Sequence, residues 1–352
     1  MAANSLRIMA SPEYYTVLAP WIANAPNRPQ TLLLDDLRLW MSGETQPIAG
    51  TLLQPVSADG VPAEWVSLPG ARRDIRILYL HGGGYISGSP LPYREFTSEL
   101  SQATNAVLLA PDYRLGPEHP FPAAVEDAVT AYRWMRRNDP AGTADGGHTF
   151  IMGDSAGGGL TLATLLALRD AGDPLPDGAI TISAYTDLAH TGASVQTRAE
   201  ADLVNRPSWL SVYAGNYLCG ADPRHPLASP LYADFAGLPP LLLQVGDAET
   251  IRDDTTRVAE KARVAGVEVT CEVWPEMIHV WHLRKPSFPE AREAVAHIVS
   301  FIEAIVAAKR QDFFNRRLRR LRRRNIRVLS CNADACQSYL HDGRDSGFHK
   351  QP

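Results

Sequence analysis

Short apolar runs alternate with longer amphipathic segments over most of the chain. The runs have the length of buried strands and lie at residues 75–80, 106–110, 149–152, 179–183, 241–245 and 268–274. Helical spacing of apolar positions is seen at residues 122–137, 156–169 and 253–265, and a last helix is predicted to begin near Pro289. This alternation predicts an α/β fold with a mostly parallel central sheet and helices on both faces.

The N-terminal part of the chain is less regular. Residues 51–68 are strand-like, with turns predicted at residues 58–60 and 69–70. Residues 1–50 show helical spacing that is interrupted by three prolines, Pro20, Pro26 and Pro29. We therefore predict two short N-terminal helices, which could either cover a site or pack on the sheet edge.

Residues 188–232 lie between two predicted strands but lack strand character themselves. They carry two modest helical patterns, near residues 195–201 and 207–218. An insertion of this size between strands often forms a lid or a specificity wall.

The run at residues 149–152 leads into Gly153-Asp154-Ser155-Ala156-Gly157, which fits the pattern Gly-x-Ser-x-Gly. In this pattern the serine sits on a sharp turn from strand to helix, and the flanking glycines leave room for a strained backbone. The following helix would direct N–H groups toward a negative charge beside the Ser155 hydroxyl. Alone, the motif is equally compatible with a glycine-rich turn before a packed helix.

A second glycine-rich segment, His81-Gly82-Gly83-Gly84, follows the strand at residues 75–80. Consecutive glycines let the backbone approach a ligand closely, with N–H groups outside the sheet ladder. An oxyanion hole requires such fixed donors. A phosphate-binding loop is the alternative, but its Gly-x-Gly-x-x-Gly and Gly-Lys-Ser/Thr patterns are absent here, so we favour the oxyanion hole.

Other polar residues follow strands as well. The proline-rich loop at residues 111–122 contains Arg114, Glu118 and His119, which could be catalytic. We expect instead that the charged residues Arg114 and Glu118 form a hydrogen-bonded pair that fixes the loop.

An acidic loop at residues 247–254 and a loop that contains His279 follow the last two predicted strands. Because the carboxyl ends of parallel strands meet at one edge of a sheet, these loops, the glycine loop and Ser155 should share that edge. The order serine, acid, histidine is that of α/β hydrolases and differs from the chymotrypsin and subtilisin orders.

Composition limits the function classes. The 352 residues are 45% hydrophobic and 21% charged, which is ordinary for a soluble globular protein. The net charge of −5 hides an asymmetry: from Lys309 onward there are 12 Lys and Arg against 4 Asp and Glu, which leaves 22 against 35 in residues 1–308. An acidic body argues against nucleic acid as the main substrate.

The four cysteines, Cys219, Cys271, Cys331 and Cys336, are too few and too scattered for a disulfide scaffold. Cys331 and Cys336 lack the spacing and partner histidines of a zinc site, so we expect no metal. The N-terminus lacks a secretion-signal pattern, and no apolar run approaches the length of a membrane span. We therefore expect a cytoplasmic protein with reduced thiols.

Four motifs together resemble the hormone-sensitive-lipase-like family of α/β-hydrolase esterases, in its Gly-Asp-Ser-Ala-Gly branch. They lie at residues 81–84, 113–120, 153–157 and 277–279, and the resemblance covers roughly residues 50–305. It implies an α/β-hydrolase fold with a helical cap. The chain then divides into N-terminal cap helices (1–50), a catalytic domain (51–308, with the cap insertion 188–232) and a basic tail (309–352).

The resemblance also implies roles for individual residues. Ser155 corresponds to the nucleophile and His279 to the general base. The backbone amides of Gly83, Gly84 and Ala156 correspond to the oxyanion donors, with Gly82 as an alternative to one of them.

The acid is where the chain departs from the common family pattern. Glu249 stands where many members have aspartate, although other members use glutamate. Asp247 is the alternative acid, and Asp253 or Asp254 is expected to cap the next helix.

The function implied is cofactor-free hydrolysis of carboxylic esters with short to medium acyl chains. A lactone, carbamate or aryl-formamide hydrolase would use the same machinery. From another class, a small-molecule receptor on this scaffold would be expected to lose the base, whereas Ser155 and His279 are both present. The expected partner is a small ester, and a homodimer is compatible with the sequence.

In the basic tail, Phe314, Leu318 and Leu321 are spaced as on one helix face among many arginines. A basic amphipathic helix could bind an anionic membrane or nucleic acid. Because the tail resembles no part of the family, we favour a disordered extension without such contacts.

Overall fold

The structure of the protein is a computed structural model that describes residues 10–144, 146–284, 288–311 and 315. The chain divides into two compact units, residues 1–302 and 303–352. In the second unit, residues 303–311 and 315 are helical, and most of the predicted basic tail lies outside the described residues. The first unit carries the sheet and all of the candidate site residues.

An eight-stranded sheet forms the centre of the first unit, in the order β1-β2-β4-β3-β7-β8-β9-β10. The first two strands pair antiparallel, and β2 also pairs antiparallel with β4, whereas every later pair is parallel. The strands are β1 (Leu52–Ala58), β2 (Val61–Ser67), β3 (Arg72–Leu80), β4 (Ala106–Pro111), β7 (His148–Asp154), β8 (Gly178–Ile182), β9 (Leu241–Gly246) and β10 (Val269–Trp274). The predicted mostly parallel sheet is confirmed.

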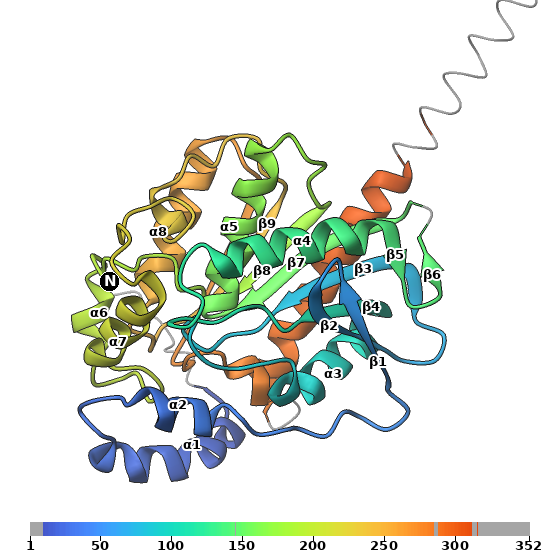
Figure 1. Ribbon diagram of the computed structural model, residues 1–352. Coiled ribbons are helices and arrows are strands. Elements are labelled where there is room, and N and C mark those ends of the chain that lie inside the picture. The colour runs from blue at the N-terminus through green and yellow to red at the C-terminus, as the bar shows by residue number, and fades with distance from the viewer. Residues whose placement is uncertain (1–9, 145, 285–287, 312–314, 316–352) are drawn as a thin grey trace, which may run out of the picture. The chain divides into compact units, whose positions relative to one another are not determined.

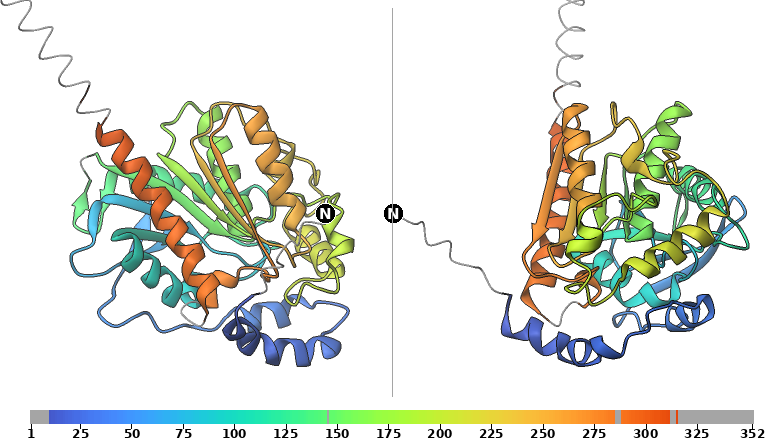
Figure 2. Two further views of the ribbon diagram at one scale, coloured as in Figure 1. Left: turned by 180° about the vertical axis from the view of Figure 1, so that it is seen from behind. Right: turned by 90° about the vertical axis from the view of Figure 1, so that its left-hand side faces the viewer.

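Helices cover both faces of this sheet. Figure 1 shows α4 and α5 in front of it, and Figure 2, seen from behind, shows α3 and helical residues 289–302 across the opposite face. The helices that cover the two faces include α3 (Arg94–Thr104), α4 (Ala123–Arg137), α5 (Ala156–Asp170) and α8 (Arg252–Val264), and α8 packs on β9 and β10. A two-stranded ribbon of β5 (Asn138–Asp139) and β6 (Gly142–Thr143) follows α4.

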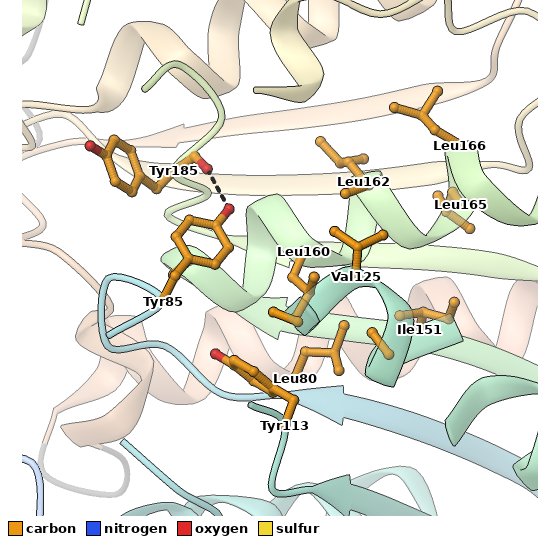
Figure 3. Packing of buried hydrophobic residues seen from close by; sticks show 14 of the residues in the cluster. Leu80, Tyr85, Tyr113, Val125, Ile151, Leu160, Leu162, Leu165, Leu166 and Tyr185 are labelled. Atoms are coloured by element: carbon orange, nitrogen blue, oxygen red, sulfur yellow. Dashed lines mark hydrogen bonds between the residues drawn. The ribbon is translucent and has the colours of Figure 1, made fainter. Parts of the chain in front are cut away.

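Helix α5 has the largest share of buried residues among these helices. Twelve of its 15 residues are buried, because it packs on β7 and β8 and is covered by α4. Figure 3 shows Leu160, Leu162, Leu165 and Leu166 of α5, which belong to a buried apolar cluster. The same close-up shows the Tyr85 hydroxyl donating to the carbonyl of Tyr185 (3.2 Å), which satisfies a polar group inside this apolar layer.

The hydrophobic pattern does not predict α3. Its buried side carries hydroxyl residues, and these donate back to nearby carbonyls, Thr97 to Tyr93 and Thr104 to Leu100 among them. Such self-satisfied hydroxyls allow burial but dilute the apolar spacing that marks a helix in the sequence.

The N-terminal helices and the insertion lie beyond the carboxyl ends of the strands (Figures 1 and 2). They comprise α1 (Pro12–Asn24), α2 (Leu34–Trp40), α6 (Ser194–Thr197) and α7 (Pro207–Leu218), with short 3₁₀ turns at Ala25–Asn27 and Pro230–Tyr232. Two further 3₁₀ turns, Leu91–Tyr93 and Trp281–Arg284, lie outside these segments. Helix α6 is shorter than the predicted pattern at residues 195–201.

The expectation that Pro20 interrupts a helix is wrong, because α1 continues through it. Pro20 cannot donate a backbone hydrogen bond to the carbonyl of Thr16. Both residues are exposed, so water can satisfy that carbonyl.

Helix α1 is attached to the segment that precedes His279. The Tyr14 hydroxyl donates to the Glu276 carbonyl (2.6 Å), and the Tyr15 hydroxyl donates to the Glu276 carboxylate. At the start of α1, the amide and the hydroxyl of Ser11 both donate to Glu290. The first helix is therefore held by polar contacts with residues more than 250 positions away.

Within the described residues, no helix combines the length and the apolar character that crossing a membrane requires.

We predict that Leu160→Ala lowers the free energy of unfolding by about 2–5 kcal/mol, because the side chain is fully buried in α5 and its loss leaves a cavity. Leu39→Ala in α2 is the matched control, since Leu39 is 76% exposed and its loss should change stability by less than about 0.5 kcal/mol. Urea unfolding followed by circular dichroism measures both, and equal losses would contradict the assignment of α5 to the core.

Candidate active site

Ser155 occupies a sharp turn between β7 and α5. Its backbone has φ 53° and ψ −120°, a conformation that a residue with a side chain rarely adopts. Three hydrogen bonds hold it there: its amide donates to Ile182 at the end of β8 (2.8 Å), and its carbonyl accepts from Tyr185 (2.9 Å) and Gly159 (3.1 Å). The turn presents the Ser155 side chain to a cavity at the carboxyl ends of the strands.

His279, on the loop after β10, contacts both Ser155 and Glu249. Its Nε2 lies 2.9 Å from the Ser155 Oγ, and its Nδ1 lies 2.8 Å from the Glu249 Oε2. The carboxylate is fully buried, and the imidazole is 8% exposed. The structure thus aligns a hydroxyl, an imidazole and a carboxylate from three separate loops.

Glu249 is fixed by further hydrogen bonds to its other oxygen. Oε1 accepts from the Ser183 hydroxyl (2.7 Å) and from the Gly246 amide (2.6 Å). The Ser183 hydroxyl in turn accepts from the amide of Val280, next to His279 (3.1 Å). Because both oxygens of the carboxylate are bonded, its orientation toward the imidazole is determined.

The other acidic residues of this loop have different partners. The carboxylate of Asp247 accepts from Arg198 (3.0 Å) and Arg252 (2.9 Å), and no bond joins it to His279 among the described contacts. The expectation that Asp253 or Asp254 caps α8 is wrong, since α8 has no side-chain cap.

These two aspartates instead bind the insertion and the segment before it. Asp253 accepts from the amide of Ser194 (2.9 Å), and Asp254 accepts from the amides of Thr186 (2.8 Å) and Asp187 (2.9 Å). Their partners lie some 60 residues earlier in the chain, so local sequence gives no sign of them.

The protonation of His279 follows from its surroundings. Burial alone would lower the pKa of the imidazole, but the hydrogen bond and the charge of Glu249 outweigh it, with added contributions from Asp202 and Asp154. The pKa of His279 is therefore raised above its ordinary value of 6.5. Because this pKa is higher in the folded than in the unfolded protein, the protonated His279 stabilises the fold at low pH. This contribution to the free energy of unfolding is lost as the pH rises through the folded-state pKa.

The glycine loop follows β3 and faces the same cavity. Gly83 and Gly84 line it, and within the described residues their amides have no protein acceptor. Gly84 has φ 65°, and a side-chain carbon there would lie 2.7 Å from the Tyr213 ring. Ala156 is the first residue of α5, a position whose amide has no acceptor within the helix. Gly83 and Gly84 thus share a cavity with Ser155, and Ala156 directly follows Ser155 in the chain.

Gly82 does not share this property. Its amide donates to the Asp154 Oδ1 and to the Tyr93 hydroxyl, both at 3.0 Å. It is therefore unavailable as the alternative donor that the sequence left open.

Asp154, the second residue of the Gly-Asp-Ser-Ala-Gly motif, joins the serine turn to the glycine loop. Besides the Gly82 amide, it accepts from the hydroxyls of Tyr79 (2.7 Å) and Tyr93 (3.1 Å). Burial raises the pKa of this carboxyl to about 6, although the tyrosine hydrogen bonds act in the opposite direction. The motif includes this residue, but sequence reasoning assigned it no role.

The expected pair between Arg114 and Glu118 is absent. Arg114 binds Asp127 at 2.8 Å in α4, and Glu118 binds Arg38 of α2 at 2.6 Å. The loop is therefore fixed at two points, one on α4 and one on α2. His119 is exposed and away from the residues that line the cavity.

The cavity above Ser155 has a volume of about 380 Å³. Its roof comes from the segments that depart from the strand and helix alternation. Among its lining residues are Trp21, Leu37 and Trp40 of the N-terminal helices, and Val204, Asn205 and Tyr213 of the insertion.

Asp202 connects the insertion to the loop that carries Glu249. It is fully buried, and its Oδ2 accepts from both the amide and the hydroxyl of Thr250 at 2.8 Å. Its Oδ1 accepts from the amides of Val204 and Asn205, both at 2.9 Å. Nothing in the sequence around Asp202 indicates this connection, because its main partner lies 48 residues away.

Among the residues that the structure describes, no group of three or more His, Cys, Asp or Glu side chains is arranged to hold a metal ion.

The model of a protein family described as the alpha/beta hydrolase fold matches residues 77–283, which contain the glycine loop, Ser155, Glu249 and His279. A crystal structure titled as an esterase from the bacterial hormone-sensitive lipase family is 42% identical, with a TM-score of 0.77, and covers 85% of this chain and 100% of that one. The chain belongs to the α/β-hydrolase family, in its hormone-sensitive-lipase-like branch of esterases.

Other proteins named as hydrolases or esterases are also similar to this chain in sequence or in structure. An acetyl-hydrolase of Streptomyces hygroscopicus is 49% identical over 241 residues, 68% of this chain and 79% of that protein. An esterase of Acinetobacter venetianus is 31% identical over 287 residues, 80% and 90% of the two chains. The crystal structure of EstE5 soaked with p-nitrophenyl butyrate is 42% identical, has a TM-score of 0.78, and covers 85% of this chain and all of that one.

We predict that Glu249→Gln lowers the pKa of His279 in this esterase from above 6.5 to below it. The substitution keeps a hydrogen-bond acceptor of the same shape but removes the charge that offsets burial. A pH titration of the ¹⁵N-labelled imidazole by NMR measures the change. Asp247→Asn, in the same loop, is the control and should leave the titration in place; a larger shift in the control would contradict the geometry.

Proposed function

We propose that this protein hydrolyses carboxylic esters with short to medium acyl chains. Ser155 serves as the nucleophile, His279 as the general base and acid, and Glu249 as the carboxylate that orients the imidazole. The amides of Gly83, Gly84 and Ala156 form the oxyanion hole. The observation that carries the proposal is the hydrogen-bonded series from the Ser155 Oγ through His279 to Glu249, at 2.9 and 2.8 Å.

The distances and the burial support these roles. A serine hydroxyl is a weak nucleophile unless a base lies within hydrogen-bond reach, and the imidazole meets this condition. The buried carboxylate holds Nδ1 protonated, so that Nε2 is free to accept the serine proton. Its charge also stabilises the imidazolium that forms during the reaction.

The reaction then proceeds in two halves. His279 takes the proton of Ser155 as the Oγ attacks the carbonyl carbon of the ester, and the negative charge moves to the carbonyl oxygen, which the three amides stabilise. The intermediate collapses when His279 donates its proton to the leaving alcohol. Water is deprotonated by the same imidazole, attacks the acyl-serine, and releases the acid while the proton returns to Ser155.

The segments that surround the cavity support a small substrate. We propose that residues 1–50 and 188–232 act as a cap over the catalytic domain, because both supply lining residues above Ser155. The volume of about 380 Å³ is that of a small-ligand site. Relatives named acetyl-hydrolase and a related esterase soaked with p-nitrophenyl butyrate support esters of this size.

A receptor without activity is not favoured. Ligand binding alone requires neither an imidazole within reach of a hydroxyl nor a buried carboxylate behind it. The cytoplasmic location and the homodimer inferred from the sequence stay predictions.

We predict that Ser155→Ala lowers kcat/KM for p-nitrophenyl butyrate by at least about 10⁴-fold, because the acyl-enzyme can no longer form. A fluorophosphonate probe should label the wild-type protein and not the variant, since only an activated serine reacts with it. Ser211→Ala, at an exposed position of α7, is the control and should retain both activity and labelling. Turnover or labelling that persists in Ser155→Ala would mean that another residue is the nucleophile.

We predict that Glu249→Gln lowers kcat by roughly 10³–10⁴-fold, because the imidazole loses the charge that stabilises its protonated form. Asp247→Asn should lower kcat by less than about tenfold, since that carboxylate pairs with Arg198 and Arg252. Steady-state kinetics with p-nitrophenyl butyrate compares the two, and the opposite ranking would transfer the acid role to Asp247.

A further inference from the structure

A second cavity lies beside the one that contains Ser155. Its volume is about 400 Å³, and nine of its thirteen lining residues are apolar. Leu32, Leu203 and Trp209 line this cavity and not the first. Neither Ser155 nor His279 reaches it. The space is thus apolar, similar in size to the candidate active site, and outside the proposed machinery.

Four residues line both cavities: Trp21, Leu37, Trp40 and Val204. A residue that borders two cavities has open space on two sides, so the partition is one residue thick at these positions. The rings of Trp21 and Trp40 meet edge to face, with centroids 6.5 Å apart. We refer to these four residues as the partition.

The partition combines rigid and adjustable parts. Leu37 is buried, whereas Trp40 is 60% exposed and Val204 is half-buried. The backbone of Val204 is held by Asp202, whose carboxylate accepts its amide (2.9 Å). A substitution of the Val204 side chain therefore changes the barrier between the two cavities, while the backbone of residue 204 stays hydrogen-bonded to Asp202.

Among the described residues, Arg28 is the cation that lines the second cavity. The Arg28 Nη2 donates to the Asp202 carbonyl (2.8 Å), and its guanidinium lies over the Trp209 ring at 5.8 Å from the centroid. Its Nε and Nη1 are shielded from solvent and have no hydrogen-bond partner among the described residues. The other polar lining residues are Asn24, Asn27 and Asp36, and the Asp36 carboxylate would repel an anionic group. The nine apolar residues therefore make a hydrocarbon chain the better fit.

We propose that the partition sets the length of hydrocarbon chain that this esterase accepts, by closing the first cavity off from the second. A short chain attached to the reacting carbonyl fits within the first cavity. A longer chain meets the partition, and the second cavity is the space into which it would extend once the partition is reduced. This inference rests on the proposed function, since it concerns the substrate of the same site.

The test compares Trp40→Ala and Val204→Ala with wild type on p-nitrophenyl esters from acetate to palmitate. We expect the ratio of kcat/KM for dodecanoate to that for butyrate to rise at least tenfold in each variant, because each further buried methylene is worth roughly fourfold. The bulkier Val204→Phe should act in the opposite direction and lower the octanoate to acetate ratio. Leu39→Ala, on the same helix as Trp40 but lining neither cavity, should keep the wild-type ratios.

A second series of alkyl butyrates, from butyl to dodecyl, identifies which side of the ester supplies the chain. A gain with the p-nitrophenyl series assigns the second cavity to the acyl chain, and a gain with the alkyl butyrates assigns it to the alcohol. Variants that hydrolyse butyrate but show wild-type ratios in both series would overturn the inference and leave the proposed function intact. Wild-type protein that neither hydrolyses butyrate nor reacts with a fluorophosphonate would instead count against the proposed function.

Discussion

The unfavourable backbone conformation of Ser155 is the constraint on which the site depends. Such conformations cost about 1–3 kcal/mol and persist only where the surroundings enforce them. Here the enforcement comes from β8, from Tyr185 beyond it and from the first turn of α5. Gly157 packs so closely on the Leu80 carbonyl that any side-chain carbon there would overlap it. The sheet layer therefore holds the hydroxyl in place, and the loops after the other strands need only reach it.

Those loops are in turn held by buried carboxylates. Asp154 joins the serine turn to the glycine loop through the Gly82 amide, and Glu249 joins the ends of β8 and β9 to the imidazole. Asp202 performs a similar task between the insertion and Thr250. Each of these groups is buried, and each accepts several hydrogen bonds that offset its loss of hydration. These contacts link Ser155 and His279 to Val204 and Asn205, which line the cavity.

The sequence predicts what depends on local order and misses what depends on distant pairing. The parallel strands, the serine turn, the glycine loop and the loop of His279 follow from apolar runs and from the residues directly after them. The choice of Glu249 required the family resemblance, because Asp247 in the same loop is an equal candidate by pattern alone. The partners of Arg114 and Glu118 could not be predicted, since Glu118 binds Arg38, 80 residues earlier. The continuation of α1 through Pro20 could not be predicted, because it depends on the exposure of the Thr16 carbonyl region to water. Helix α3 could not be predicted, because its buried hydroxyl residues bond to nearby carbonyls and interrupt the apolar spacing.

The attachment of α1 has a consequence for how this protein can vary. The helix that supplies Trp21 to the roof is hydrogen-bonded through Tyr14 and Tyr15 to Glu276, three residues before His279. Under the proposed function, a change in α1 would bear on both the lining of the cavity and the loop that carries His279. A substitution in α1 that changes the lining of the cavity would therefore also change the support of the loop before His279.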